Sequence, residues 1–223
     1  MRFEEIARTS VSVAETPSRL AKVRHLASLL RSLRAEEVPV AVAHLSGTLP
    51  QGSIGIGWAA LRDLPPPAAE PTLELLEVDA ALTRIQGTVG AGSQAARRRE
   101  VASLFERATE AERRFLFGLL TGEVRQGALE GVMVEAVAKA SGLGAAEIRR
   151  AAMLAGDLGP VAAAALGDGK EGLASFRLQL LRPVQPMLAQ TAQDLDEAFG
   201  RICPAGVEWK LDGARLQVHR RGA

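Results

Sequence analysis

The stretch GALEGVMVEAVAKAS, residues 127–141, decides the fold class of this chain. Its apolar side chains recur at the i, i+3, i+4, i+7 spacing; they are Leu129, Val132, Met133, Ala136, Val137 and Ala140. That spacing places them on one face of a helix, and Gly142 directly after it is the residue type that often ends a helix. We therefore predict an amphipathic helix that buries this face against other helices.

The segments on both sides of this helix carry similar patterns. Before it, helices are predicted after Ser18, over 36–45, from Thr72 to about Gly87, after Ser93 and after Thr109; behind it, over 145–154 and 157–166. The first has an apolar stripe at Leu20, Val23, Leu26, Leu30 and Leu33. Capping side chains are expected at Ser18, Ser93, Thr109 (with Glu112 in a capping box) and Asp157. Residues up to about 166 are predicted to be all-α.

Three early segments do not fit a helix. Residues 1–17 are mixed in character and are expected to form a loose arm, and the proline-rich stretch 64–71 is a connector. Between the helices, residues 52–58 read Gly-x-x-Gly-x-Gly-Trp, which has neither the dinucleotide-binding order nor the P-loop spacing. We interpret it as a structural turn that packs Trp58 against neighbouring helices.

The composition changes after residue 166. Residues 167–172 are glycine-rich and are expected to form a linker, 176–181 to be extended, and about 194–200 to form a short helix. The alternation of apolar and polar residues around the tight-turn signal Asp212-Gly213 then predicts a hairpin. Lys210 would lie at the end of a strand beside this turn, a placement that suits a lysine nucleophile. Because an isolated hairpin is marginally stable, we expect the sequence to be cut inside a second domain.

Composition excludes some classes of protein. Of 223 residues, 47% are hydrophobic, 24% are charged and 4% are aromatic, which is typical of a globular protein with more helix than sheet. No apolar run approaches the length of a membrane span, and the single Cys203 cannot form an intrachain disulfide, so we expect a cytoplasmic protein without membrane association. The net charge of +1 identifies no partner.

The hairpin carries a specific motif, Glu208-x-Lys210-x-Asp212-Gly213-x-Arg215. With four lysines in the chain, Lys-x-Asp-Gly would arise by chance about 0.01 times. The motif resembles the nucleotidyl-transfer motif of ATP-dependent DNA ligases, RNA ligases and mRNA-capping enzymes. A surface hairpin with a solvated lysine is the alternative.

Three further stretches resemble ATP-dependent DNA ligases that have an N-terminal helical DNA-binding domain; they are 122–132, 155–159 and 183–189. This resemblance implies a mainly α chain. Residues 1–170 would form a helical-bundle DNA-binding domain and 171–190 a linker and approach segment. Residues 191–223 would be the truncated start of an α/β nucleotidyltransferase (adenylation) domain. Capping enzymes and most RNA ligases are not known for such a helical domain, and the Arg- and Ala-rich composition suggests a bacterial member.

The resemblance also implies roles for individual residues. Lys210 would accept AMP from ATP, Glu208 would approach the adenine amino group, Arg215 would contact ribose or phosphate, and Asp212 would help hold Mg²⁺ through water. The turn containing Arg125 and Gly127 would contact the DNA backbone. Two simpler readings remain open: Glu208 and Arg215 could form a surface ion pair, and the clusters 97–99, 113–114 and 149–150 could be solvated helix faces.

The implied activity is the sealing of nicks in double-stranded DNA by a monomeric ligase. AMP would pass from ATP to the lysine and then to the 5′-phosphate, before the 3′-hydroxyl attacks. The fragment alone is expected to be inactive, because the family's downstream motifs are absent from it. The alternative is a non-catalytic helical module that clamps DNA, and the role in replication, repair or recombination is left open.

Overall fold

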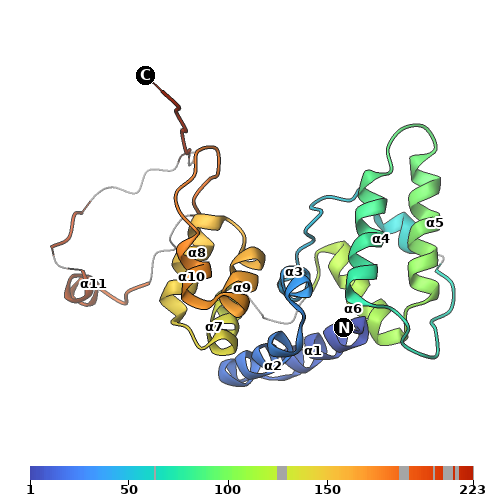
Figure 1. Ribbon diagram of the computed structural model, residues 1–223, viewed down its shortest axis with the longest axis horizontal. Helices are drawn as coiled ribbons and strands as arrows, with labels where there is room; N and C mark the ends of the chain where they lie inside the picture. Colours follow the sequence, from blue (N-terminus) through green and yellow to red (C-terminus); the bar gives the residue numbers. More distant parts are fainter. Residues whose placement is uncertain are drawn as a thin grey trace.

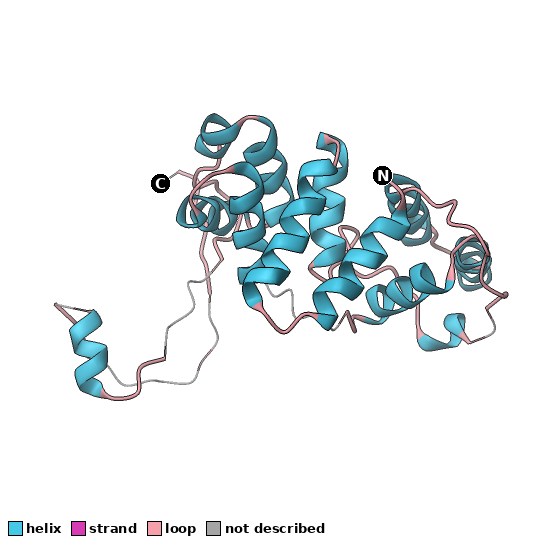
Figure 2. Cartoon of the chain, turned by 90° about the horizontal axis from the view of Figure 1, so that it is seen from below, coloured by secondary structure: helices cyan, strands magenta, loops and turns pink. Residues whose placement is uncertain are grey.

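The computed structural model describes residues 1–62, 64–124, 130–185, 191–202, 204–207, 213 and 216–222. Their regular structure is helical, and no strand is assigned among them beyond one isolated bridge between Arg2 and Glu74 (Figure 2). The helices are α1 (Phe3–Glu15), α2 (Arg19–Ser32), α3 (Val38–Leu45), α4 (Leu75–Gly87), α5 (Ser93–Glu106), α6 (Glu110–Thr121), α7 (Glu130–Ser141), α8 (Ala145–Ala155), α9 (Leu158–Gly167), α10 (Gly169–Ala174) and α11 (Leu195–Arg201), with short 3-10 helices η1 (Ala35–Glu37) and η2 (Trp58–Leu61). The predicted mainly α class is confirmed.

The helices form two groups joined by α1 and α2. Figure 1 shows α4, α5 and α6 on one side, α7 to α10 on the other, and α3 between them. The second group is held by packing of α2 on α7, of α3 on α9, and of α8 and α10 on α9, while α1 contacts both α2 and α6. Helix α11 lies apart from both groups (Figure 1).

The expectation of a loose arm over residues 1–17 is wrong, because Phe3–Glu15 form α1 and one face of this helix is buried. Its inward face consists of Phe3, Ile6, Ala7, Ser10 and Val13. These follow the i, i+3, i+4, i+7 spacing, but the small Ala7 and Ser10 make the stripe hard to recognise among polar neighbours. The Phe3 ring lies 5.7 Å from the Phe115 ring, so α1 packs into the core through its first turn.

The predicted helix starts are mostly confirmed. The Ser18 side chain accepts a hydrogen bond from the Ala21 amide, and Asp157 accepts one from Gly159. Thr109 and Glu112 form the expected capping box. Ser93 is the exception, since it is the first helical residue of α5, and Gly92 at φ 79° occupies the cap instead. A left-handed conformation there is open to glycine, so the turn before α5 needs no side-chain cap.

The predicted stripe of α2 is correct in the middle and wrong at its start. Val23, Leu26 and Leu30 are buried, whereas Leu20 is 74% exposed. The first turn of α2 meets α7 through Arg19, whose guanidinium lies 2.8 Å from a Glu135 carboxylate oxygen. A charged contact therefore takes the place that the sequence pattern assigned to a leucine.

Gly172 serves packing, and the expected linker over 167–172 is helical from Gly169 onward. Helix α10 lies against α9, and a Cβ on Gly172 would come within 2.6 Å of the Ala164 carbonyl oxygen. Glycine allows this close approach, so a run that resembles a flexible linker is part of the packed body. Residues 176–181, expected to be extended, form no strand, and the short helix expected at 194–200 is confirmed as α11.

Candidate functional site

The residues predicted to act on nucleotide and DNA fall outside the described part of the chain. These residues are Glu208, Lys210, Asp212 and Arg215 of the hairpin motif and Arg125 and Gly127 of the DNA turn. Their roles stay predictions. The segments that flank both stretches are described. They show how each stretch is attached to the packed helices α1 to α10, which we call the helical body.

The segment that follows the lysine motif lies beside residues 181–184. The Val184 amide donates to Gln217 Oε1 over 2.8 Å, and the Leu181 amide donates to His219 Nδ1 over 3.1 Å. Both bonds use side chains, and residues 216–222 form no strand, so the second strand of the predicted hairpin is not formed there. A strand obtains its backbone hydrogen bonds from a neighbouring strand, and no such neighbour is present among the described residues.

Gln185 connects residues 181–184 and the segment beside them to the helical body through two hydrogen bonds. Its amide donates to the Met153 carbonyl over 3.1 Å, and its side-chain amide donates to the Gly156 carbonyl over 3.2 Å. Both acceptors lie where α8 ends and turns toward α9. The stretch leading into the lysine motif is therefore held at the α8–α9 turn, which is one of the stretches that resemble DNA ligases.

The segment just before the predicted DNA turn is held by Val124, which packs against the hydrophobic core. Gly122 ends α6 in the left-handed conformation, at φ 72°, and Val124 then packs against the core. A Cβ at Gly47 would lie 3.4 Å from Val124 Cβ, and one at Gly118 would lie 3.6 Å from Val124 Cγ2. Small residues on α6 and after α3 thus make room for the chain where it leaves α6.

The same turn ends at the start of α7, where the Arg19 side chain is held in place by Glu135. Arg19 donates from Nε and Nη2 to the carboxylate of Glu135, and this hydrogen bonding holds the pKa of Glu135 below its usual range. Arg19 Nη2 also lies 3.4 Å from the position that a Cβ on Gly131 would take. The first turn of α7 is therefore next to a fixed positive charge.

The arginines of the three clusters differ in whether their side chains contact other residues of the chain. The Arg113 guanidinium lies 5.7 Å from the Phe105 ring centre, which gives it a structural contact. Arg98, Arg99, Arg114 and Arg150 are exposed, and none forms an ion pair with another described residue. Two of the acids placed among them pair elsewhere, since Glu100 binds Arg84 and Glu147 binds Lys170. Four arginines thus remain available for an external anion.

Trp58 was interpreted from the sequence as a packed residue, but it is 58% exposed. Its ring packs against the Phe117 ring of α6, with ring centres 5.2 Å apart and planes at 72°. The run of glycines before it was visible in the sequence. That run of glycines did not predict whether the Trp58 indole would be buried or exposed.

Two buried titratable residues are structural. The pKa of Glu37 is lowered to about 2, first by the hydrogen bond from the Arg34 side chain, and also by the Met1 amino group and the Arg34 amide. Burial lowers the pKa of His44 to about 4, and neither of its ring nitrogens has a hydrogen-bond partner. Both residues lie inside the helical body.

Among the described residues no group of three or more His, Cys, Asp and Glu side chains is placed to hold a metal ion. None of the helices described has the length and apolar character needed to cross a membrane.

Comparison with known proteins adds a family relationship. Residues 59–138 match the family described as DNA ligase N terminus. Along its whole length the chain is 56% identical to a protein of Anaeromyxobacter dehalogenans (strain 2CP-C) named "Probable DNA ligase" and 54% identical to one of the same name from Mycolicibacterium gilvum (strain PYR-GCK). The chain spans 44% of the length of each of these relatives.

Proposed function

We propose that this chain, which is similar along its whole length to probable DNA ligases, is part of an ATP-dependent enzyme that seals nicks in double-stranded DNA. The observation that carries the proposal is the Glu-x-Lys-x-Asp-Gly-x-Arg motif at 208–215, in a chain related over its whole length to probable DNA ligases. We further propose that the protein acts as a monomer in the cytoplasm.

Lys210 is the proposed nucleophile. Its amine must lose a proton before its nitrogen can attack the α-phosphorus of ATP, forming a P–N bond while pyrophosphate leaves. Glu208 and Asp212 stand two residues to either side, and their carboxylate oxygens are of the kind that Mg²⁺ prefers. Bound Mg²⁺ would offset charge on the triphosphate and favour the neutral amine. We assign Glu208 to the adenine amino group, Arg215 to ribose or phosphate, and Asp212 to the metal through water.

The helical body is the proposed DNA-binding part. Arg125 and Gly127 lie in sequence between the described end of α6 and the start of α7, where Arg19 forms an ion pair with Glu135. Backbone N–H groups at a helix start bind phosphate well, and such contacts position DNA without reading its sequence. Positive charge on the described part of this body comes from Arg98 and Arg99 of α5 and Arg114 of α6, which form no ion pair with another described residue.

The test is a labelling experiment on the full-length protein with radiolabelled ATP and Mg²⁺. Lys210→Ala should abolish the covalent AMP adduct and leave the affinity for nicked DNA unchanged, because the substitution removes only the attacking amine. Lys170→Ala is the matched control, since Lys170 is an exposed lysine whose one ion pair with a described residue is to Glu147 at 3.9 Å. An adduct that persists in Lys210→Ala would reject this residue as the AMP acceptor.

A non-catalytic helical clamp on DNA is the competing function. It predicts DNA binding by the wild type with no adduct at all. Wild-type labelling together with loss in Lys210→Ala excludes the clamp, whereas DNA binding without any labelling supports it.

A further inference from the structure

One aromatic side chain of the helical body is exposed without an evident structural need. Among the large hydrophobic residues that are described before residue 178, those that are exposed are Val11, Leu20, Trp58 and Val89. Trp58 is the only aromatic one in this set. It opens η2, directly after the glycine-rich loop, and its exposed fraction of 58% leaves most of the indole in solvent.

The indole is nevertheless fixed in position. Phe117 of α6 meets it edge to face, at 5.2 Å and 72°, and Phe117 itself packs against the hydrophobic core. Such T-shaped pairs are favourable by about 0.5–1.5 kcal/mol beyond the area that they bury. The fold therefore presents an open aromatic surface in a defined orientation.

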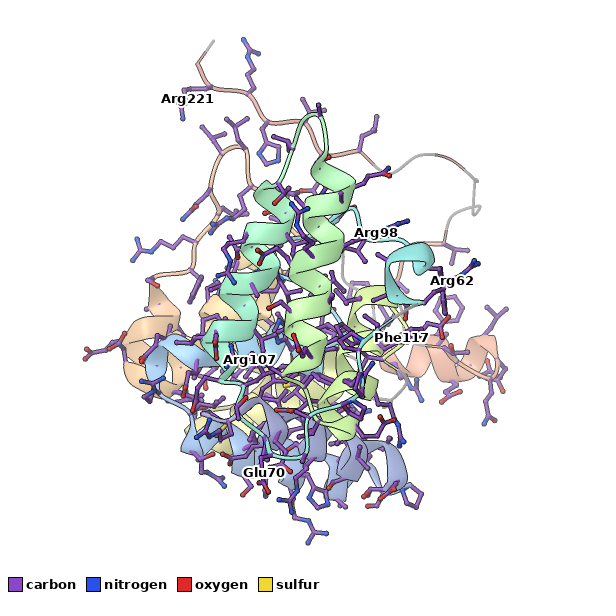
Figure 3. All side chains as sticks on the ribbon, turned by 90° about the vertical axis from the view of Figure 1, so that its right-hand side faces the viewer. Arg62, Glu70, Arg98, Arg107, Phe117 and Arg221 are labelled. Carbon is purple, nitrogen blue, oxygen red and sulfur yellow. The ribbon has the colours of Figure 1, made fainter. Side chains whose placement is uncertain are left out.

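Three arginines lie at the end of η2, which carries Trp58, or on α5, which contacts η2. Arg97 of α5 reaches across the loop before Trp58, where its Nη1 donates to the Gly55 carbonyl oxygen over 3.4 Å. Gly55 is at φ 66°, and a Cβ there would collide with the Arg97 guanidinium, so glycine makes this approach possible. Figure 3 shows two more arginines in the same view, Arg98 of α5 and Arg62 at the end of η2, with Phe117 below them.

This charge is not neutralised within the described part of the chain. Arg62 and Arg98 are exposed and form no ion pair with a described residue, and Glu100, the nearest acid along α5, is paired with Arg84 at 3.5 Å. Arg97 Nε is buried and has no hydrogen-bond partner. A fixed aromatic ring bordered by unpaired guanidinium groups has the chemistry that binds a nucleobase and its neighbouring phosphates.

We propose that Trp58 is a stacking surface for an unpaired or end-exposed DNA base, with Arg62, Arg97 and Arg98 holding the adjoining phosphates. This inference rests on the proposed DNA-binding function and adds a second contact to the one at Arg125 and Gly127. A base inside an intact duplex has both faces covered by its neighbours, so Trp58 selects DNA in which a base is unstacked. Gaps and strand ends offer such bases.

Tryptophan fluorescence tests the proposal directly. The chain contains two tryptophans, so Trp209→Phe leaves Trp58 as the reporter in the 223-residue chain. Titration with a duplex that carries a one-nucleotide gap should quench the Trp58 emission, while an intact duplex of the same length should not. Equal quenching by both duplexes overturns the proposal, because it would place Trp58 against duplex surface.

Affinities measured by fluorescence anisotropy across a salt series separate stacking from charge. Trp58→Ala should weaken binding to gapped duplex about tenfold and leave the salt slope unchanged, since stacking is not electrostatic. Arg98→Ala should lower the slope by about 0.9, as should Arg125→Ala at the first contact. Leu20→Ala, which removes another exposed apolar side chain, should change neither quantity.

The outcomes distinguish this inference from the proposed function. Unchanged affinity in Trp58→Ala, with DNA still bound through Arg125, overturns the inference alone. Failure of the wild-type chain to bind any DNA overturns the DNA-binding proposal as well. Trp58→Phe guards against misfolding, because it keeps the contact with Phe117 and should retain part of the affinity for gapped DNA.

Discussion

The helical body and the C-terminal segment of this chain differ sharply in where they place apolar side chains. From Phe3 to Ala165 the described chain buries a continuous core in which residues such as Phe3, Leu26 and Met133 are fully inaccessible. Among the described residues from Leu178 to Val218, nine large hydrophobic residues are exposed, Val218 by 89%. The two regions have similar residue types, so the difference lies in what each region packs against.

This contrast shows which kinds of structure a sequence can specify by itself. A helix forms its hydrogen bonds within one segment, and a stripe of apolar residues is enough to dock it on a neighbour. A strand depends on another strand for its hydrogen bonds. The alternating residues near Lys210 accordingly form no ladder where they are described, while helices form from α1 to α10.

The largest expected effect is on stability, and it compares two phenylalanines. Phe3→Ala should lower the free energy of unfolding by about 3–5 kcal/mol, because it opens a cavity between α1, Phe115 and His44. Phe199→Ala on α11, where the ring is 44% exposed, should cost under about 1 kcal/mol. Chemical denaturation measures both. Similar losses in the two variants would mean that α11 is packed as tightly as α1.

The stability of the helical body should depend on pH through the buried His44. Burial lowers the pKa of His44 from 6.5 to about 4, so between these values the unfolded chain binds a proton that the folded chain does not. Stability should therefore fall as the pH drops from 6.5 to 4, by up to about 3 kcal/mol, and be unaffected by His44 above pH 6.5. Glu37, with a pKa of about 2 against 4.5, adds a loss at lower pH, as its paired carboxylate is protonated.

The measurement is the free energy of unfolding at a series of pH values from 4.5 to 7. His44→Leu should flatten the slope below pH 6.5, because the titrating group is gone. His25→Asn is the control, since His25 is exposed, and this variant should keep the wild-type slope. A steep slope that survives in His44→Leu would assign the pH dependence to another group.

Much of the helical body could be predicted from local patterns. The capping box at Thr109, the cap at Asp157 and the buried face of α7 were all readable, because each depends on residues within one turn or two. The misses at α1, Leu20 and α10 share a different cause. Small residues such as Ser10 and Gly172 gain their meaning from the helix packed against them, and that neighbour is distant in sequence.

The candidate site was predictable to a different extent. The lysine motif could be recognised from spacing alone, whereas the choice of DNA ligases among three families depended on the stretches 122–132, 155–159 and 183–189, and the similarity to probable DNA ligases agrees with that choice. The exposed Trp58 could not be recognised, because its direction is set by Phe117, which lies far along the chain on α6. Geometry that depends on contacts between distant segments is not encoded in a short motif.

The smallest expected effect concerns the side-chain bonds that link the two regions. Gln217→Ala removes the acceptor of the Val184 amide, now at 2.8 Å, and the exchange of that amide with solvent should become several times faster. Global stability should change by less than about 0.5 kcal/mol, because the bond is exposed and no core residue moves. Hydrogen exchange followed by NMR gives the local rate, and denaturation gives the global value. Arg220→Ala, a nearby exposed change with no described hydrogen bond, should leave the Val184 rate as it is. If Gln217→Ala instead lowered global stability by a core-sized amount, the C-terminal segment would be an integral part of the helical body and the contrast between the two regions would fail.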